Sequence, residues 1–252
     1  MPYRRLPNTD RARLTTLQRA VQRASEADYN EQVLDYKTIQ ETQRFLLQFE
    51  TLVMQYHNNY NTKVSSNKQY SRVVKMARMY LSHFIQVFNM AVVRGEIKKE
   101  ARTLFGLDIH NNNVPDLTTE EDLLYWGDKI IAGENERISK GGFPIYNPAI
   151  NKVKAYFDMF KEQQKSHSYH KKNTARAYEN VEQLRSQADT LIVDIWNKVE
   201  NYYKDNLPYK RLTSCKQYGV IYYYRSGEKR LTPETDKQLE QNAASQTSIQ
   251  WT

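Results

Sequence analysis

Two long stretches of this chain contain neither glycine nor proline, and they restrict its fold more than any other feature of the sequence. The first runs from Asn8 to Arg94 and the second from Ala149 to Leu207. Both are rich in Gln, Glu, Lys, Arg, Leu and Ala, which favour helix, and both lack the two residue types that most often interrupt one. The sequence therefore predicts long helices in both stretches.

Apolar residues within these stretches recur at steps of three and four positions. The most regular series is Ala177, Val181, Leu184, Ala188, Leu191, Ile195, Val199 and Tyr202. A second series is Tyr70, Val73, Ala77, Leu81, Phe84, Phe88 and Ala91. This spacing places the apolar side chains on one face of a helix. We expect these faces to pack together and form the core.

Capping residues and the positions of Gly and Pro divide the chain into about six helices. We expect helices over residues 9–27, 36–62, 66–95, 119–139, 148–167 and 174–205, with a short extension over 96–105. Between the last two main helices the boundary is open, because residues 166–173 contain no Gly or Pro and one continuous helix is an alternative. Gly141 and Gly142 are expected to form the C-cap and turn after the helix over 119–139.

The predicted fold class is all-α, an elongated up-and-down bundle with a short C-terminal β-hairpin. The hairpin is expected from the aromatic and β-branched run Tyr218–Tyr224, a turn over 225–228, and Lys229–Leu231. The expected organisation is a three-helix half over 1–107, a second half over 108–205 that joins it in one bundle, a basic aromatic hairpin over 206–232 and a disordered tail over 233–252.

The chain carries a formal net charge of +8, and this charge is unevenly distributed. Residues 1–24 and 204–231 are strongly basic, whereas residues 108–138 are acidic. A basic surface attracts polyanions. The alternative is that basic and acidic segments face each other within one fold or across a dimer.

Cations and tyrosines gather at both ends of the chain and make up the candidate nucleic-acid-binding residues. They are Arg4, Arg5, Lys210, Arg211, Lys216, Tyr222, Tyr224, Arg225, Lys229 and Arg230. Tyrosines flanked by cations can stack on bases while the cations follow the phosphates. The alternative, which the alternation of the tyrosines favours, is that they serve as one packed face of the predicted hairpin.

Signatures of catalysis and of metal binding are absent from the sequence. It contains no glycine-rich phosphate loop, no Gly-x-Ser-x-Gly, no His-Glu-x-x-His and no Cys-x-x-Cys. His167 and His170 have helical spacing, but neighbouring lysines oppose a bound cation. The nearby Lys216 and Arg211 would lower the pKa of the single cysteine, Cys215, while a buried, unreactive thiol is the alternative. We expect no catalytic residue, no metal and no cofactor.

No apolar run follows Arg4 and Arg5, so the start of the chain does not resemble a secretory signal. The longest charge-free run, Met79–Val93, is too short and too polar to cross a bilayer. We expect a cytoplasmic protein without membrane association.

The opening residues Tyr3-Arg4-Arg5-Leu6-Pro7-Asn8-Thr9-Asp10, followed by Arg11-x-Arg13-Leu14, resemble the start of a family of all-helical bacterial proteins that has no known activity. The resemblance covers this segment and the general helix pattern. It implies a bacterial, intracellular origin and assigns no functional residue.

A non-enzymatic structural or protein-interaction role is the function that these features favour, with a protein partner or self-association. One alternative is a basic helical protein associated with nucleic acid. A second alternative is an enzyme with an unrecognised interhelical site, which would need a deep pocket lined by several ionisable side chains.

Overall fold

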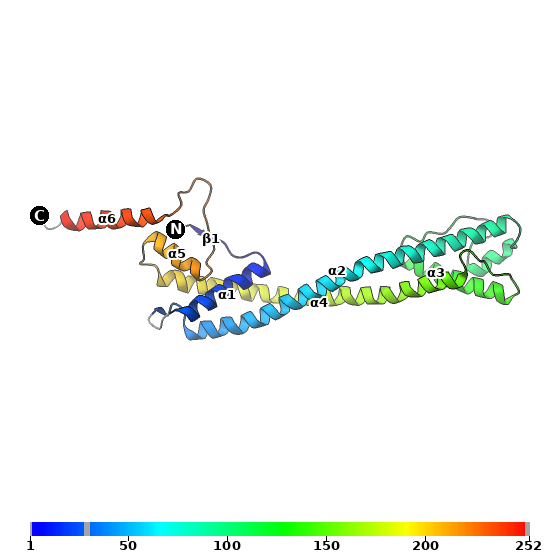
Figure 1. The fold of residues 1–252 in the computed structure, drawn as a ribbon, viewed down its shortest axis with the longest axis horizontal. Helices are drawn as coiled ribbons and strands as arrows, with labels where there is room; N and C mark the ends of the chain where they lie inside the picture. Colours follow the sequence, from blue (N-terminus) through cyan, green and yellow to red (C-terminus); the bar gives the residue numbers. More distant parts are fainter. Residues whose placement is uncertain (1, 28–30, 250–252) are drawn as a thin grey trace. The chain divides into compact units, whose positions relative to one another are not determined.

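The computed structural model describes residues 2–27 and 31–249, with side chains described through residue 242 (Figure 1). Its helices are α1 (Asp10–Glu26), α2 (Tyr36–Val93), the 3₁₀ helix η2 (Lys99–Phe105), α3 (Glu120–Ser139), α4 (Ile150–Tyr202), α5 (Pro208–Gln217) and α6 (Pro233–Ile249). Strands β1 (Tyr3–Arg4) and β2 (Tyr222–Tyr223) form a two-stranded antiparallel sheet. The predicted all-α class with a short antiparallel strand pair is confirmed.

Two continuous helices, α2 with 58 residues and α4 with 53, lie in the stretches that contain neither glycine nor proline. The expected break between 36–62 and 66–95 is wrong, whereas the alternative of one continuous helix through residues 166–173 is confirmed. Polar side chains in both regions bond within the helix. Ser65 Oγ donates to the Thr62 carbonyl at 3.0 Å, and Thr174 Oγ1 donates to the His170 carbonyl at 2.8 Å. Among the described residues, no helix is both long enough and apolar enough to cross a membrane.

Two compact units make up the fold. Unit 1 contains residues 1–58 and 175–252, and unit 2 contains residues 59–174. This division differs from the expected halves over 1–107 and 108–205. The reason is that α2 and α4 each contribute residues to both units, so neither unit is a continuous half of the chain.

Unit 1 has a core in which α1, the first part of α2, the last part of α4 and α5 meet (Figure 1). Leu17 of α1, Phe49 of α2 and Ile192 of α4 are fully buried in it. The side chains of Val181, Ala188, Ile195 and Val199 line the same core. The apolar stripe predicted for this part of α4 is therefore the buried face of the helix as far as Val199, whereas Tyr202 at the end of the series is 48% exposed.

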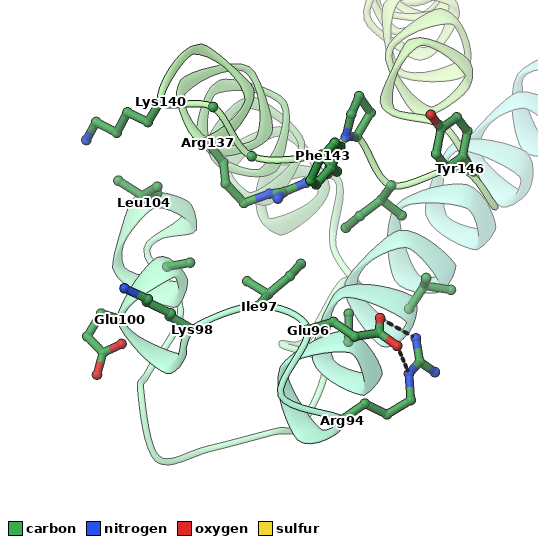
Figure 2. A pocket seen from close by; sticks show the side chains of 17 residues that line it. Arg94, Glu96, Ile97, Lys98, Glu100, Leu104, Arg137, Lys140, Phe143 and Tyr146 are labelled. Atoms are coloured by element: carbon green, nitrogen blue, oxygen red, sulfur yellow. Dashed lines mark hydrogen bonds and ion pairs between the residues drawn. The ribbon is translucent and has the colours of Figure 1, made fainter.

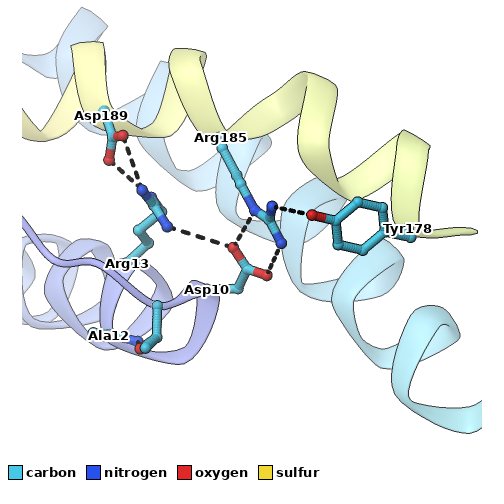
Figure 3. Close-up of polar contacts among 7 residues, drawn as sticks. Asp10, Ala12, Arg13, Tyr178, Arg185 and Asp189 are labelled. Atoms are coloured by element: carbon cyan, nitrogen blue, oxygen red, sulfur yellow. Dashed lines mark hydrogen bonds and ion pairs between the residues drawn. The ribbon is translucent and has the colours of Figure 1, made fainter. Parts of the chain in front are cut away.

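Ion pairs hold α1 against α4 within unit 1 (Figure 3). Arg185 donates to both carboxylate oxygens of Asp10 at 2.9 Å, and Arg13 donates to both oxygens of Asp189 at 2.8 and 3.0 Å. Tyr178 accepts a further bond from Arg185 at 3.2 Å, and the Asp10 contact raises the pKa of the Arg185 guanidinium. Asp10 and Arg13, both from the opening segment, thus have a structural role.

The start of α2 is capped by Asp35 and tied to α4 by Lys198. The Asp35 carboxylate accepts from Thr38 Oγ1 at 2.6 Å and from Lys198 Nζ at 3.1 Å. These hydrogen bonds, with Thr38 the larger cause, lower the pKa of Asp35 to about 2. The carboxylate is therefore ionised at neutral pH and can hold both partners.

The strand partner differs from the predicted hairpin. The turn forms, with Glu228 N donating to the Arg225 carbonyl at 3.1 Å, but Lys229–Leu231 do not become a strand. Instead β2 pairs with β1, with Tyr3 opposite Tyr223 and Arg4 opposite Tyr222. A long-range pairing has replaced the local one because the packing of α1 brings the start of the chain to β2.

The tail over 233–252, for which we expect disorder, contains α6 as far as Ile249, and residues 250–252 lie outside the described residues. Asp236, which is buried, accepts hydrogen bonds from the backbone N–H groups of Tyr209 and Lys210 at 2.9 Å each. These groups lie in the first turn of α5, whose own N-cap residue, Leu207, has no side-chain acceptor. Asp236 therefore caps α5 from another helix.

Unit 2 packs α3 tightly against η2 and α4 because two positions of α3 have no side chain. A Cβ atom at Gly133 would lie 2.7 Å from the Leu104 carbonyl oxygen. At Gly127 it would lie 2.1 Å from the Phe157 ring. Only glycine allows both close approaches. Phe88, Leu123 and Phe160 are among the buried residues of the resulting core.

The loop after η2 is held in place by two buried side chains, Arg102 and Asn89, and Asn89 Nδ2 donates to the Asn112 carbonyl at 2.8 Å. Arg102 is fully buried, and its guanidinium donates to the Asp108 carbonyl at 2.8 Å, to Asn112 Oδ1 at 2.6 Å and to the Asn111 carbonyl. Three acceptors satisfy this buried cation, which fixes the loop on η2.

Candidate functional site

A cavity of 810 Å³ lies within unit 2, between the end of α2, η2, the end of α3 and the loop over 140–146 (Figure 2). Its apolar wall includes Val87, Ala91, Ile97, Leu104 and Ile145. This volume is in the range of sites that hold a drug-sized molecule or a few side chains of a partner. We call it the α2–η2 cavity.

Glycines at two helix ends create the space. At the end of α2, Gly95 has a φ of +78°, and Glu96 N donates back to the Ala91 carbonyl at 3.0 Å. At the end of α3, Gly141 has a φ of +88°, and Gly142 N donates to the Arg137 carbonyl at 3.0 Å. Both ends are left-handed glycine caps. The predicted C-cap and turn at Gly141 and Gly142 is confirmed, and the two caps direct the chain around the cavity.

A buried ion pair on α3 fixes the loop over 140–146. Arg137 Nε and Nη2 donate to the two carboxylate oxygens of Glu134 at 2.8 Å each. Arg137 Nη2 also donates to the Phe143 carbonyl at 2.6 Å, and Ile145 N donates to Glu134 Oε1 at 3.2 Å. Glu134 is fully buried and Arg137 is 7% exposed. One wall of the cavity is therefore held to α3 by both partners of the pair.

Arg137 also leaves one donor open at the cavity. Its Nη1 takes part in no hydrogen bond among the described residues, whereas Nε and Nη2 are both bonded. Arg137 lines the cavity, and Figure 2 shows its side chain extending toward Phe143. This nitrogen can donate to a carbonyl or carboxylate oxygen of an occupant.

Two large aromatic side chains stand exposed on the rim. Phe143 is 89% exposed and Tyr146 is 79% exposed, although the backbone on either side of Pro144 is fixed. Aromatic residues of this kind contribute strongly when a partner covers them. The loop over 140–146 therefore presents apolar surface that a partner can cover, and its backbone is already ordered.

Charged side chains of both signs surround the mouth. Arg94 donates to both oxygens of Glu96 at 2.7 and 3.0 Å, which raises the pKa of Arg94 and lowers that of Glu96 (Figure 2). Lys140 pairs with Glu136 at 2.7 Å. Because the pKa values of Arg94 and Glu96 move away from neutrality, this pair is poorly suited to exchange protons near pH 7. The ionisable groups that the enzyme alternative requires are present, but this arrangement favours binding.

Three of the predicted nucleic-acid residues converge on Glu200 in unit 1. Arg4 pairs with Glu200 at 3.5 Å, and Tyr222 donates its hydroxyl to the Glu200 carboxylate at 2.6 Å. Arg211 donates to the Glu200 carbonyl at 3.2 Å. Burial, together with this carboxylate, raises the pKa of Tyr222. These residues are engaged in internal contacts.

Other members of the predicted set remain on the surface of unit 1. The Arg225 guanidinium lies 4.1 Å from the centre of the Tyr3 ring, and the Tyr3 and Tyr223 rings are 5.6 Å apart. Arg5 adjoins this group because its N–H donates to the Ile221 carbonyl at 3.0 Å. The side chains of Lys210, Lys216, Lys229 and Arg230 are exposed, and the Tyr224 hydroxyl accepts from Leu231 N. The sheet thus joins Arg5 and Arg225, which are far apart in sequence.

The structure also decides the state of Cys215. The thiol is fully buried in the core of unit 1, and burial raises its pKa above the ordinary value. Desolvation therefore outweighs the nearby cations, and the interpretation of Cys215 as a buried thiol is confirmed. Among the described residues, no group of three or more His, Cys, Asp or Glu side chains could hold a metal ion. His167 stacks on Tyr70, with their ring centres 4.4 Å apart.

Comparisons with known proteins add nothing to the geometry: no family model matches this chain, and neither the curated proteins nor the solved structures contain a match. The family resemblance of the opening segment therefore stays a prediction.

The sequence analysis missed the α2–η2 cavity, although two signals for it are present. Glu134 and Arg137 continue the apolar series Leu123, Gly127 and Ile130 at steps of three and four. Charged residues in line with a buried stripe indicate a buried pair. The second signal is the position of Phe143 directly after Gly141 and Gly142, because two glycines predict a turn and a turn exposes the apolar side chain that it carries.

We expect Glu134→Gln to lower the free energy of unfolding by about 3 kcal/mol, because it leaves the Arg137 cation buried without its counter-charge. The matched control is Glu136→Gln on the same helix, whose partner Lys140 is 62% exposed. This exposed pair should contribute less than about 1 kcal/mol. Chemical denaturation of both variants measures the difference, and equal losses would contradict the role given to the buried pair.

Proposed function

We propose that this chain is a non-enzymatic protein-interaction protein and that the α2–η2 cavity holds apolar side chains of another polypeptide. The observation that carries the proposal is the exposed pair Phe143 and Tyr146 on the rim of an apolar-walled cavity. Exposed aromatic side chains beside a cavity are typical of a surface that a partner covers.

Energetics support this use of the cavity. Burying one large apolar side chain contributes about 1.5–3 kcal/mol, so two rim aromatics and an occupant in the cavity supply enough for a specific contact. The loop that carries Phe143 is already fixed by Glu134 and Arg137. Association therefore does not need to order this loop, which lowers its entropic cost.

The polar groups of the cavity fit a polypeptide occupant. Arg137 Nη1 is an open donor at the wall, and every residue of an incoming segment offers a backbone carbonyl as acceptor. The exposed charges at the mouth have both signs, so they can remain solvated at the edge of an interface while its apolar centre is dry.

A cavity-filling variant tests the proposal. Ala101 lines the cavity from η2, and Ala101→Trp should weaken the binding of short aromatic and aliphatic peptides by about tenfold or more, equivalent to ~1.4 kcal/mol. The measurement is fluorescence anisotropy with an array of labelled peptides that carry two apolar residues in a Gly/Ser background. The control is Ala155→Trp on the exposed face of α4 in the same unit.

Peptide binding that is lost in Ala101→Trp and kept in Ala155→Trp supports the proposal. If no peptide of the array binds the wild type, or if both variants bind as the wild type does, the cavity does not hold apolar side chains and the proposal fails.

A second candidate function, association with nucleic acid, is favoured by one observation. The pairing of β1 with β2 brings the Tyr3 ring next to the Tyr223 ring and under the Arg225 guanidinium, and the backbone of Arg5 bonds to Ile221 at the same sheet. Tyr3 and Tyr223 are 40% and 41% exposed, so their rings are accessible to bases. Exposed rings with adjacent cations are the elements of a single-strand binding surface.

For this candidate we expect a single-stranded oligonucleotide to bind with a steep salt dependence. Arg225→Gln should reduce the slope of log K against log salt by about 0.7 if this guanidinium contacts one phosphate. Lys154→Gln, an exposed cation on α4, is the control and should leave the slope unchanged. Absence of binding at low salt would exclude the candidate.

A further inference from the structure

We infer that the occupant of the α2–η2 cavity is the Phe143 loop of a second copy of this chain, so that two copies form a two-fold symmetric dimer. This inference rests on the proposed function and names its partner. It is carried by the position of Phe143, which is 89% exposed on the rim of the cavity it would fill in the other copy.

Symmetry makes this arrangement self-consistent. In a two-fold dimer the same patch is used on both copies, so each residue pair across the interface occurs twice. The projecting ring and the cavity both belong to one patch of unit 2. Placing two such patches face to face therefore allows each Phe143 to enter the opposite cavity, and the contact closes without leaving a free patch.

Charges of both signs at the mouth allow a second copy to approach, although each chain carries a net charge of +8. Arg94 and Glu96 form an ion pair there, and Lys98 and Glu100 add one exposed charge of each sign. The two further cations of the lining, Arg137 and Lys140, are balanced by their partners on α3, Glu134 and Glu136. A rim with balanced charges gives no electrostatic steering to an acidic or a basic partner. Two identical rims of mixed sign can meet without net repulsion, and the cations of one copy can face the anions of the other.

Hydrogen bonding is complementary in the same way. Arg137 Nη1 is an open donor in each copy, and the incoming loop supplies backbone carbonyl oxygens on both sides of Phe143. Pro144, which follows Phe143, brings no N–H group that would need a partner inside the cavity. The loop can therefore enter an apolar cavity without a buried unpaired donor at this residue.

The surface area that the two copies can bury determines how tightly we expect them to bind. Each Phe or Tyr buries roughly 150–250 Å², so Phe143 and Tyr146 from two copies bury roughly 600–1,000 Å². With the surrounding rim, this approaches the lower limit of about 1,200 Å² for specific interfaces. We therefore expect a reversible dimer with a dissociation constant in the micromolar range.

Sedimentation equilibrium of the full chain over roughly 1–100 µM, around the expected dissociation constant, tests the inference. The wild-type mass should rise from the monomer value of 29.9 kDa toward twice that value as concentration increases. Phe143→Ser, which removes the projecting ring, and Ala101→Trp, which fills the cavity, should each remain monomeric. Leu47→Ser is the matched control, because Leu47 is an apolar side chain 71% exposed on α2 in unit 1, and it should dimerise as the wild type does.

Mixing the two monomeric variants distinguishes insertion of Phe143 into the opposite cavity from non-specific association of apolar surfaces. Phe143→Ser keeps an open cavity, and Ala101→Trp keeps the projecting ring, so one of the two insertions can form between them. The mixture should therefore contain heterodimer at concentrations where neither variant dimerises alone. Circular dichroism confirms that each variant is folded, which is expected for Phe143→Ser because the side chain is on the surface.

The outcomes distinguish the inference from the proposed function. A wild-type chain that stays monomeric but binds apolar peptides in an Ala101-dependent manner overturns the dimer and leaves the interaction role in place. A dimer that persists in both Phe143→Ser and Ala101→Trp also overturns the inference, because its interface lies elsewhere. A chain that neither dimerises nor binds peptides overturns both.

Discussion

The buried pair of Glu134 and Arg137 is the interaction on which the candidate site depends. A buried ion pair is costly unless its geometry is good and further hydrogen bonds satisfy most of the remaining donors and acceptors. Here the carboxylate accepts two bonds from Arg137 and one from Ile145 N, and Arg137 also holds the Phe143 carbonyl. These hydrogen bonds offset the cost of desolvating the pair, and they also fix the loop over 140–146. This loop forms one wall of the cavity and carries the exposed ring of Phe143.

Other elements of unit 2 position the ion pair and the loop. The long helices α2 and α4 provide a rigid apolar face, and two glycines of α3 let η2 and α4 approach closely enough to enclose the pair. Glycine caps then turn the chain at the ends of α2 and α3, so that the cavity forms where helices stop. Unit 1 is held separately, by its own core and by the ion pairs of Asp10 and Arg13 with α4.

Local patterns predicted what depends on local interactions. The apolar steps through Phe84 and Phe88, and through Val181 and Ile195, identified buried helix faces, and the pair Gly141 and Gly142 identified a helix end. Features that depend on distant contacts were missed. The expected break between 36–62 and 66–95 does not occur, since Ser65 bonds within α2. β2 pairs with a strand at the other end of the chain, and α6 is joined to α5 through Asp236. The cavity belongs to this second class, because two stretches that are distant in sequence, residues 87–104 and 137–146, form it together.

Native-state hydrogen exchange at the Ile145 amide tests the central claim most directly, because this group bonds to the buried Glu134 carboxylate instead of to a helix carbonyl. If the pair fixes the loop, this amide exchanges only when unit 2 opens, with a protection factor close to that of the core amides of α3. Exchange at the rate of an exposed loop would contradict the account, because the cavity wall would then open independently of the core.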